Sequence, residues 1–455
     1  MRGDLPATPR PPVALYVHLP FCVARCPYCD FTVYAGGDAR GPRARTERLY
    51  AAVGRELELR ADALDERFGR VGESGVGEVA SAAGSGAGSG AAARPPLRTV
   101  YFGGGTPSLV PGEWLERLLA IVRARFGIAP GAEVTLEANP GPDERGDLPA
   151  FRRAGVTRVS FGAQSLDPAE LRRLGRRHSP DDVAAAVALA RAAGIGSINL
   201  DLLYDVPGQS VAAWEATLRA ALALAPDHLS LYALTLDDPD AEGITGTEGD
   251  HLPTPPGARR WRERARLEQD DDRAADQYTL ATDLLASDGW RGYEISNWAR
   301  PGHESRHNLV YWEREPYEAV GPGAHAFDGV VRRWNAAAME PYLAALMPVG
   351  ITAPAGSDRP TGPHSRGGPS PVAALPPGDH EVVTPQAALA EQAILALRLD
   401  RGISEADAER PPFSEVRAWA ESAGLLEAFD FGGGRRFRLT TRGRLLSNEV
   451  FTRLL

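Results

Sequence analysis

The chain has 455 residues, which is enough for two or three domains with large buried cores. Its formal net charge of −10 argues against nucleic acid or an anionic membrane as the main partner, because both select for net positive surfaces. No apolar run approaches the ~20 residues that cross a bilayer, and the first residues lack the apolar stretch of a secretory signal. We therefore expect a cytoplasmic protein without a transmembrane segment, and these features leave only peripheral membrane contact open.

After an N-terminal tail, residues 1–13, six short β-rich apolar runs punctuate the first half of the chain, and segments with helical spacing separate most of them. The expected strands are Ala14–Leu19, Thr99–Phe102, Glu133–Leu136, Arg158–Phe161, Ser197–Leu203 and His228–Leu234. The expected helices are Thr46–Leu64, Glu113–Phe126, Asp181–Ala193 and Val211–Leu224. Alternating strands and helices predict an α/β protein with a parallel sheet. Because six such units occur without a dinucleotide-binding fingerprint, we expect residues 14–236 to form a partial (β/α)6 barrel.

Three stretches have the composition of linkers or surface insertions. Gly72–Pro96 is rich in Gly, Ala and Ser and is expected to be disordered; Asp237–Arg273 is acidic and interrupted by Pro; and Ile351–Pro377 is rich in Pro and Gly. The expected domains after the barrel are therefore an extension over 237–350, a linker over 351–381 and a C-terminal domain over 382–455. The pattern of that last domain is helix, helix, a hairpin around Gly432–Gly434, then helix, which predicts a winged-helix-like α+β fold.

The cysteines are confined to one loop directly after the first expected strand. Cys22, Cys26 and Cys29 are the only three in the chain, so they cannot form a disulfide framework, and their CxxxCxxC spacing indicates a metal or cluster site. Most electron-transfer clusters use four cysteines. With three, one iron of a 4Fe–4S cluster would stay open to another ligand, as the open position of a catalytic zinc does. The alternative is a zinc site in which His18 or Asp30 is the fourth ligand.

Polar groups also follow the carboxyl ends of the later strands. They are the glycine-rich run GGGTP at Gly103–Pro107, Glu137 in LEANPG, Gln164 in FGAQS, and Asp201. In barrel-like α/β folds these ends line the functional site, whereas the opposite ends serve stability. Each group also has a structural interpretation, because the glycines can form a tight turn and the carboxylates can cap helices or pair with buried cations. The four together, behind the cysteine loop, favour a binding site.

The CxxxCxxC motif, with Tyr28 before its third cysteine, resembles the radical-SAM superfamily. The surrounding YVHLPFC and CPYCDF resemble its branch of coproporphyrinogen III dehydrogenases and haem chaperones, the HemN and HemW family. That resemblance implies a 4Fe–4S cluster on the three cysteines whose open iron binds S-adenosylmethionine. It also implies cofactor contacts from Tyr16, Tyr28, Gly104, Gly105, Thr106, Glu137, Gln164, Arg176 and Asp201.

Two sequence features favour a chaperone within this family. Phe31 stands where the dehydrogenases have a further cysteine, and HNLVYW at His307–Trp312 resembles the HNxxYW motif of the chaperones. The resemblance implies that the protein binds haem and transfers it to an acceptor protein. A neutral imidazole can ligate haem iron and aromatic rings can cover a porphyrin face, so the expected haem contacts are His307, Asn308, Tyr311 and Trp312.

Alternatives remain at this point. HNLVYW can be a structural turn with core aromatics, and His303 and His325 are rival iron ligands. The competing function is an oxygen-independent coproporphyrinogen III dehydrogenase, which would use SAM to decarboxylate propionate side chains oxidatively. A third function, DNA binding by the C-terminal domain, would depend on its basic cluster, which the negative net charge disfavours. That cluster comprises Arg435, Arg436, Arg438, Arg442 and Arg444.

Overall fold

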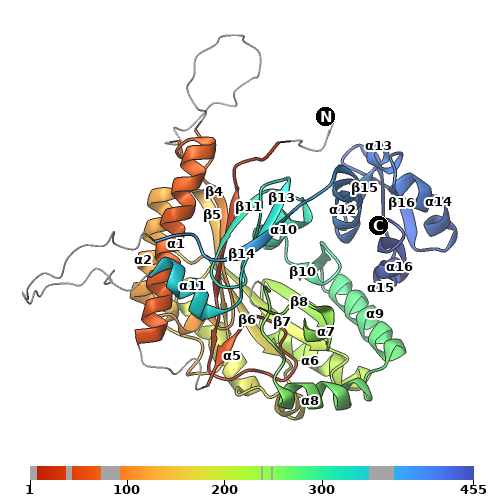
Figure 1. The fold of residues 1–455 in the computed structure, drawn as a ribbon. Helices are drawn as coiled ribbons and strands as arrows, with labels where there is room; N and C mark the ends of the chain where they lie inside the picture. Colours follow the sequence, from red (N-terminus) through yellow and green to blue (C-terminus); the bar gives the residue numbers. More distant parts are fainter. Residues whose placement is uncertain (1–7, 37–43, 73–92, 237–238, 247–248, 348–372) are drawn as a thin grey trace, which may run out of the picture.

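The structure is a computed structural model that describes residues 8–36, 44–72, 93–236, 239–246, 249–347 and 373–455 (Figure 1). Its main body is built on one twelve-stranded sheet, and a smaller unit at the C-terminus has a three-stranded sheet of its own. Helices α1 and α2 cover one side of the large sheet, and the C-terminal unit lies at the opposite side of the molecule (Figure 1). The two units have separate apolar clusters, so each has its own core.

Six neighbouring strands run parallel, and they confirm all six strands expected from the sequence. They are β1 (Ala14–Leu19), β4 (Leu97–Gly104), β5 (Ile128–Ala138), β6 (Arg158–Gln164), β7 (Ser197–Tyr204) and β8 (His228–Ala233). Most of their residues are buried, as expected for parallel strands covered on both faces. The partial (β/α)6 barrel and the α/β class are therefore confirmed.

The connecting helices include the four expected ones and several short ones. The helices are α1 (Ala44–Phe68), α2 (Gly112–Arg125), α3 (Leu148–Ala154), α4 (Pro168–Arg173), α5 (Pro180–Ala192) and α6 (Val211–Ala223), with a 3₁₀ turn at Pro107–Leu109. Helices α3 and α4 were not expected, because seven and six residues are too few to show a periodic apolar face. Each is started by a capping carboxylate, Asp147 for α3 and Asp167 for α4.

The extension continues the barrel sheet at both of its edges. Beyond β8 lie the antiparallel strands β10 (Asn297–Ala299) and β9 (Arg291–Gly292). Beyond β1 lie the parallel strand β11 (Tyr317–Val320) and the antiparallel strands β12 (His325–Phe327), β13 (Val331–Asn335) and β14 (Gly378–Val382). Helices α10 (Arg306–Trp312) and α11 (Met339–Leu346) complete this region. The sheet stays open, because β14 and β9 are its two edges.

The acidic stretch that was expected to be a surface insertion forms helices in its described part. The acidic stretch Asp237–Arg273 contains α7 (Pro239–Glu242), α8 (Pro256–Arg266) and the start of α9 (Asp271–Ser287). Within α8, Arg262 and Ala265 are 2% and 4% exposed. The apolar pattern is weak because α8 buries Arg262 and Ala265 instead of several large aliphatic side chains. Of the other two insertions, residues 73–92 and 351–372 lie outside the described residues.

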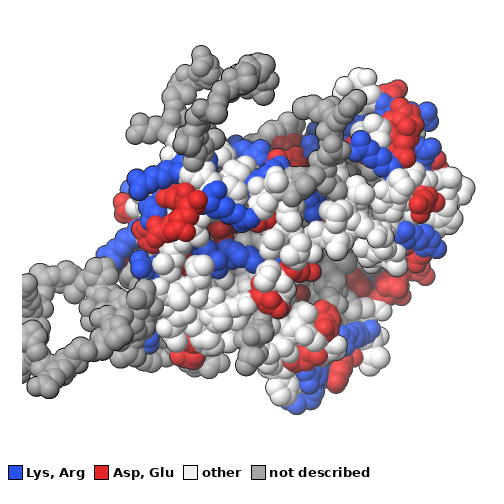
Figure 2. Space-filling view, turned by 45° about the horizontal axis from the view of Figure 1, so that its top comes forward, with Lys and Arg blue, Asp and Glu red and all other residues white. Residues whose placement is uncertain are grey.

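The C-terminal unit has the winged-helix-like order expected from the sequence. It consists of α12 (Pro385–Arg398), β15 (Ile403–Ser404), α13 (Glu405–Ala408), α14 (Phe413–Ser422), β16 (Leu426–Phe431), β17 (Gly434–Leu439), α15 (Thr441–Leu445) and α16 (Ser447–Phe451). Its arginines do not form a free basic face, because Arg438 pairs with Glu427 and Arg436 donates to backbone carbonyls. Both signs of charge are interspersed on the face shown in Figure 2.

Charged pairs join the C-terminal unit to the main body. Glu391 of α12 accepts from Arg314 at 3.0 Å and from Arg332 at 2.9 Å. Nearer the surface, Arg401 pairs with Glu313, and Asp400 pairs with Arg291, each at 2.7 Å. Among the described residues no helix is both long enough and apolar enough to cross a membrane.

Candidate functional site

The cysteine loop leaves the carboxyl end of β1 and is closed by a short parallel pair, β2 (Phe21–Cys22) with β3 (Tyr34–Ala35). All three cysteines are free thiols and line a cavity of about 560 Å³ inside the barrel. A cavity of this size is in the range of those that bind cofactors. The loop and the strand ends therefore face one shared space.

Hydrogen-bond donors reach two of the three sulfurs. The hydroxyl of Thr106 lies 3.4 Å from Cys22 Sγ, and Arg176 Nη1 lies 3.4 Å from Cys26 Sγ. Burial raises the pKa of the Cys22 thiol to about 11 and that of the Cys29 thiol to about 12. These thiols therefore hold their protons at neutral pH and must release them when they become ligands. Donors aimed at the sulfurs stabilise the resulting thiolates and tune the potential of a cluster.

The arrangement around the sulfurs fits a cluster better than a single zinc ion. Among the described His, Cys, Asp and Glu side chains, no group of three or more is gathered to hold one metal ion. A cubane does not need that convergence, since each cysteine ligates a different iron. His18 is not free to complete a zinc site, because its Nδ1 lies 3.0 Å from Tyr16 Oη and its Nε2 lies 2.9 Å from the Thr32 carbonyl.

The glycine-rich end of β4 has no side chains because there is no room for a Cβ. Gly104 has φ +114°, and a Cβ there would lie 2.6 Å from the ring of His18. A Cβ on Gly105 would lie 2.6 Å from the carbonyl oxygen of Phe21. Only glycine fits these two positions, so the backbone borders the cavity without side chains and a ligand can approach it closely.

Glu137, at the end of β5, is held by this bare strand end. Its carboxyl group accepts from the Tyr101 hydroxyl at 2.8 Å and from the Gly104 amide at 3.0 Å. Burial raises the pKa of Glu137 to about 7; the Tyr101 hydrogen bond opposes this rise and the charge of Asp201 adds to it. The group is thus partly protonated at neutral pH, and an approaching ammonium or sulfonium group would favour its ionised form.

The other predicted strand-end residues lie around the same cavity. Arg176 Nη2 donates to the Gly162 carbonyl at 2.8 Å and also to Asn139 Oδ1. Asp201 accepts from Asn199 Nδ2 at 2.7 Å and from a serine on β6. Burial raises the pKa of Asp201, and the charge of nearby Arg158 opposes that rise.

The structure divides the predicted cofactor residues into two sets. Besides the cysteines, those that line the cavity are Tyr28, Gly104, Gly105, Glu137, Gln164, Arg176, Asp201 and Asn308. Those that lie outside its lining are Tyr16, Thr106, His307, Tyr311 and Trp312. Tyr16 stacks on Tyr101 with ring centroids 6.1 Å apart, so it supports the Glu137 partner from behind.

Sequence reasoning did not identify the part of the cavity wall that lies on the strands before their carboxyl ends. Its polar groups are Arg158, Ser160, Asn199 and Ser230. Successive side chains of a strand alternate between its faces, so counting back by two from Gln164 or from Asp201 would have identified three of the four. Arg158 is 3% exposed, and its side chain has no hydrogen bond or ion pair with any residue in the described ranges.

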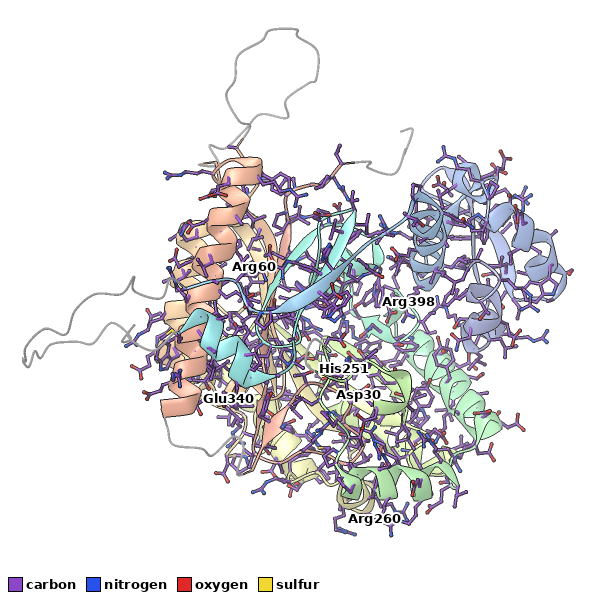
Figure 3. All side chains as sticks on the ribbon, in the orientation of Figure 1. Asp30, Arg60, His251, Arg260, Glu340 and Arg398 are labelled. Atoms are coloured by element: carbon purple, nitrogen blue, oxygen red, sulfur yellow. The ribbon has the colours of Figure 1, made fainter. Side chains whose placement is uncertain are left out.

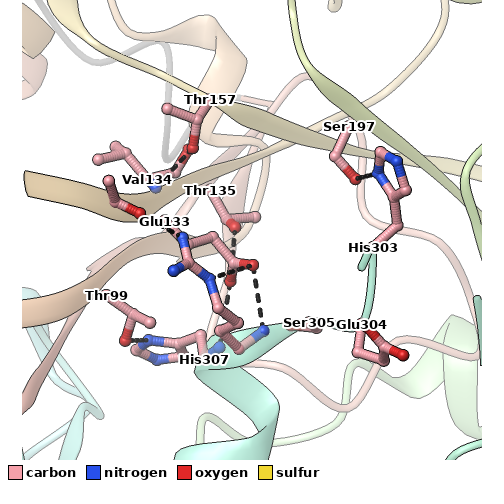
Figure 4. Close-up of polar contacts among 12 residues, drawn as sticks. Thr99, Glu133, Val134, Thr135, Thr157, Ser197, His303, Glu304, Ser305 and His307 are labelled. Carbon is pink, nitrogen blue, oxygen red and sulfur yellow. Dashed lines mark hydrogen bonds and ion pairs between the residues drawn. The ribbon is translucent and has the colours of Figure 1, made fainter. Parts of the chain in front are cut away.

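The HNLVYW segment forms α10, which lies beneath the amino ends of the strands. Ser305 caps the helix by accepting from the Asn308 amide, and the amides of Arg306 and His307 donate to Glu133 at 3.1 Å each (Figure 4). His307 Nδ1 lies 2.8 Å from Thr99 Oγ1 (Figure 4), and its Nε2 lies 2.8 Å from Tyr311 Oη. Burial lowers the pKa of His307 to about 3, so the ring is neutral.

This position limits what His307 can do. His307 is 1% exposed, and both of its ring nitrogens are in hydrogen bonds. To ligate iron the ring would have to give up one of these buried hydrogen bonds. Asn308 does reach the cavity, whereas Trp312 lies under the Arg398 guanidinium at 4.4 Å and so contacts the C-terminal unit. The structural interpretation of the motif therefore accounts for most of its contacts.

Helix α8, from the acidic stretch, holds the cysteine loop in place. Arg262 Nε donates to the Pro27 carbonyl at 3.1 Å, and its Nη2 donates to the Cys29 carbonyl at 2.9 Å. The neighbouring Trp261 packs on Tyr28 with ring centroids 6.4 Å apart. The loop that carries the cysteines is thus fastened from outside the barrel by one buried guanidinium.

Arg262→Ala should lower the free energy of unfolding by about 2–3 kcal/mol, because two buried carbonyls lose a charged donor. It should also lower the amount of iron bound after reconstitution, since the cysteine loop loses the two hydrogen bonds that position it. Chemical denaturation and iron analysis measure the two effects. Arg260→Ala is the matched control, because Arg260 lies exposed on the same helix (Figure 3). Equal behaviour of the two variants would show that Arg262 does not hold the loop.

Comparisons with known proteins agree with this geometry. Residues 87–221 match the model of the Radical SAM superfamily. The heme chaperone HemW of Mycobacterium tuberculosis (strain H37Rv) is 36% identical over 450 residues, which are 98% of this chain and 96% of that protein. The HemW of Escherichia coli K12 is 36% identical over 69% of this chain and 70% of its own. Among solved structures, E. coli coproporphyrinogen III oxidase (HemN), a radical-SAM enzyme, matches 99% of this chain and 91% of its own with a TM-score of 0.70 at 19% identity.

Proposed function

This chain belongs to the family of radical-SAM proteins that includes HemW and HemN, and on that premise we propose that it is a haem chaperone. It would bind haem, hold a 4Fe–4S cluster with S-adenosylmethionine, and transfer haem to an acceptor protein. The observation that carries this proposal is the likeness to HemW over nearly the whole of both chains. Phe31, in place of a further cysteine, supports a chaperone over a dehydrogenase.

The residues around the cavity fit the cluster and SAM. Cys22, Cys26 and Cys29 would ligate the cluster, with Arg176 and Thr106 donating to the sulfurs. When bound, the cluster supplies an iron with an open position for SAM and an electron for its reductive cleavage. The bare backbone at Gly104 lets the ligand approach, and the Glu137 carboxyl would accept hydrogen bonds from its ammonium group.

The walls of the cavity would keep water from the cluster. Tyr28 covers the loop on one side and is itself covered by Trp261. Gln164, Arg176 and Asp201 match positions that contact a second SAM in the dehydrogenases, and here they line the same cavity. Thiolate ligands and a cluster with an open iron need a reducing compartment, which supports our proposal that the protein works in the cytoplasm.

For haem, the expected contacts on α10 remain part of the proposal. Asn308 faces the cavity, whereas Tyr311 and Trp312 lie outside its lining and would need a shift of α10 to reach a porphyrin. His307 would ligate iron only if α10 shifts enough to free a ring nitrogen. The acceptor would be a protein that uses haem, since a chaperone of this kind has to pass its cargo on.

A haem titration beside an enzyme assay tests the proposal. Purified, cluster-reconstituted protein should bind haem in equimolar amount, seen as a saturable Soret band. The same preparation should form little protoporphyrinogen from coproporphyrinogen III with reductant and excess SAM. Rapid turnover of coproporphyrinogen without haem binding would instead identify a dehydrogenase. Binding of neither molecule would contradict both functions.

A further inference from the structure

Three side chains from two distant parts of the chain meet beside the cysteine loop. Asp250 Oδ1 lies 2.9 Å from His251 Nδ1, and Asp250 Oδ2 lies 2.7 Å from His325 Nε2. Each imidazole therefore has one nitrogen on the same carboxylate. The other nitrogens, His251 Nε2 and His325 Nδ1, have no hydrogen-bond partner within the described ranges, and the side chains are 30% and 37% exposed.

The carboxylate determines which nitrogen of each ring carries the proton. Although burial opposes it, hydrogen bonds from His251 and His325 hold the pKa of Asp250 well below its usual range. A carboxylate can only accept, so the ring nitrogens that face Asp250 are N–H donors. In a neutral ring the lone pair then lies on the outer nitrogen. A histidine whose inner N–H is held by a carboxylate is the usual form of a metal-ligating histidine.

No other described histidine combines these properties. His18, His228 and His307 have both ring nitrogens engaged and are buried. The Nδ1 of His303 bonds a serine hydroxyl instead of a carboxylate. The remaining two are His178, which is buried, and His380, whose ring lies 3.8 Å from the nearest carboxylate.

Of the pair at Asp250, His251 has the better geometry for a porphyrin. Its outer nitrogen is Nε2, which lies at the far end of the ring from Cβ. The outer nitrogen of His325 is Nδ1, next to Cβ, where a porphyrin plane would meet the protein backbone. The ring of His325 also stacks on Trp334 with centroids 5.7 Å apart and an angle of 22°, so it is held against the sheet.

The surroundings of His251 combine acidic side chains, Asp30 and Glu242, with one exposed aromatic residue. Figure 3 shows His251 close to Asp30, whose charge acts on the imidazole. The next residue, Phe31, is 62% exposed, which is unusual for a large aromatic side chain. Thr32 Oγ1 donates to the Asp250 carbonyl at 2.7 Å and so ties the cysteine loop to this site.

We propose that His251 Nε2 ligates the iron of bound haem, with Asp250 orienting the imidazole and Phe31 covering one porphyrin edge. His325 is then a positioning residue that holds the second oxygen of Asp250. This inference rests on the proposed haem-chaperone function and replaces α10 as the source of the iron ligand. Haem would lie at the rim of the barrel, beside the segment that directly follows Cys29.

Ferric haem titrations of single variants test the assignment. His251→Ala should raise the dissociation constant for haem at least about tenfold and change the Soret band, and free imidazole should restore the band. Asp250→Asn should keep haem bound but lower the Fe–His stretching frequency of the ferrous form, because an amide makes the imidazole a weaker donor. His303→Ala is the matched control and should behave as the wild type. Iron and sulfide content should stay unchanged in all three, which separates ligand loss from misfolding.

The outcomes distinguish this inference from the function on which it rests. If wild-type protein binds no haem, the chaperone function itself fails. If it binds haem, and His251→Ala is unchanged while His307→Ala loses the Soret band, the ligand is on α10 and this inference is overturned. Zinc binding that is lost in His251→Ala, with haem affinity unchanged, would show a cation site at these residues and would also overturn it.

Discussion

Cys26→Ser protein should retain only residual iron and sulfide after anaerobic reconstitution. The chain has three cysteines, so a serine at one of them leaves two thiolates for a cluster that already lacks a fourth. Cys26 is also the sulfur that Arg176 Nη1 approaches at 3.4 Å, so the buried guanidinium would lose its anionic partner. Iron and sulfide analysis, with the absorption spectrum of the cluster, measures the loss. SAM should then have no effect on the EPR spectrum of reduced protein.

Ala24→Ser is the matched control for this experiment, because it adds a hydroxyl group to the exposed position of the same loop. It should leave the iron content at the wild-type value. Full iron content in Cys26→Ser would contradict the assignment of Cys26 as a ligand. Stoichiometric zinc in the wild type that iron cannot replace would contradict the cluster itself.

Glu56→Ala should be among the most destabilising single changes in the main body. Glu56 on α1 is 0% exposed and its carboxylate accepts from Asn335 Nδ2 at 2.8 Å, the Tyr342 hydroxyl at 2.7 Å and the Gly321 amide at 2.9 Å. It also pairs with Arg60 at 3.2 Å. Removing one member of a buried charged network leaves the others unpaired and costs about 3–5 kcal/mol. Chemical denaturation followed by circular dichroism should show this loss.

Two further variants test whether this loss of stability comes from the buried network of Glu56. Glu66→Ala removes an exposed carboxylate from the same helix and should change the unfolding free energy by less than about 0.5 kcal/mol. Glu56→Gln keeps the shape of the side chain and should fall between the two. If Glu56→Ala were as stable as Glu66→Ala, the network would not join α1 to the extension of the sheet.

The barrel could be predicted from the sequence because its signals are local. Each parallel strand is a short apolar run between helical segments, so β1 and β7 were located to within a residue of their bounds. The polar strand ends were identified for the same reason, since Glu137 and Gln164 directly follow such runs. Their shared cavity follows from the topology, because the carboxyl ends of parallel strands lie on one side of a sheet.

The residues that could not be predicted depend on contacts between distant segments. Arg262 bonds carbonyls of the cysteine loop over 200 residues away, and in the sequence it is one arginine in an arginine-rich acidic stretch. Asp250 and His325 are likewise 75 residues apart. His307 is a different case: its family motif indicates a ligand, while the fold places it under β4 with both ring nitrogens in hydrogen bonds. Burial and hydrogen bonding decide such cases, and neither is written in a local pattern.

The charged joint between the C-terminal unit and the body should weaken only in part when the ionic strength is raised. The outer pairs, Arg401–Glu313 and Arg291–Asp400, each include an arginine with 40% or 50% of its side chain exposed, so dissolved ions can screen them. Arg314 is 7% exposed and is screened far less, so its pair with Glu391 would persist. At high ionic strength the C-terminal unit should therefore stay attached through this pair, the Arg398–Glu294 pair and the backbone bridge between Glu294 and Leu399.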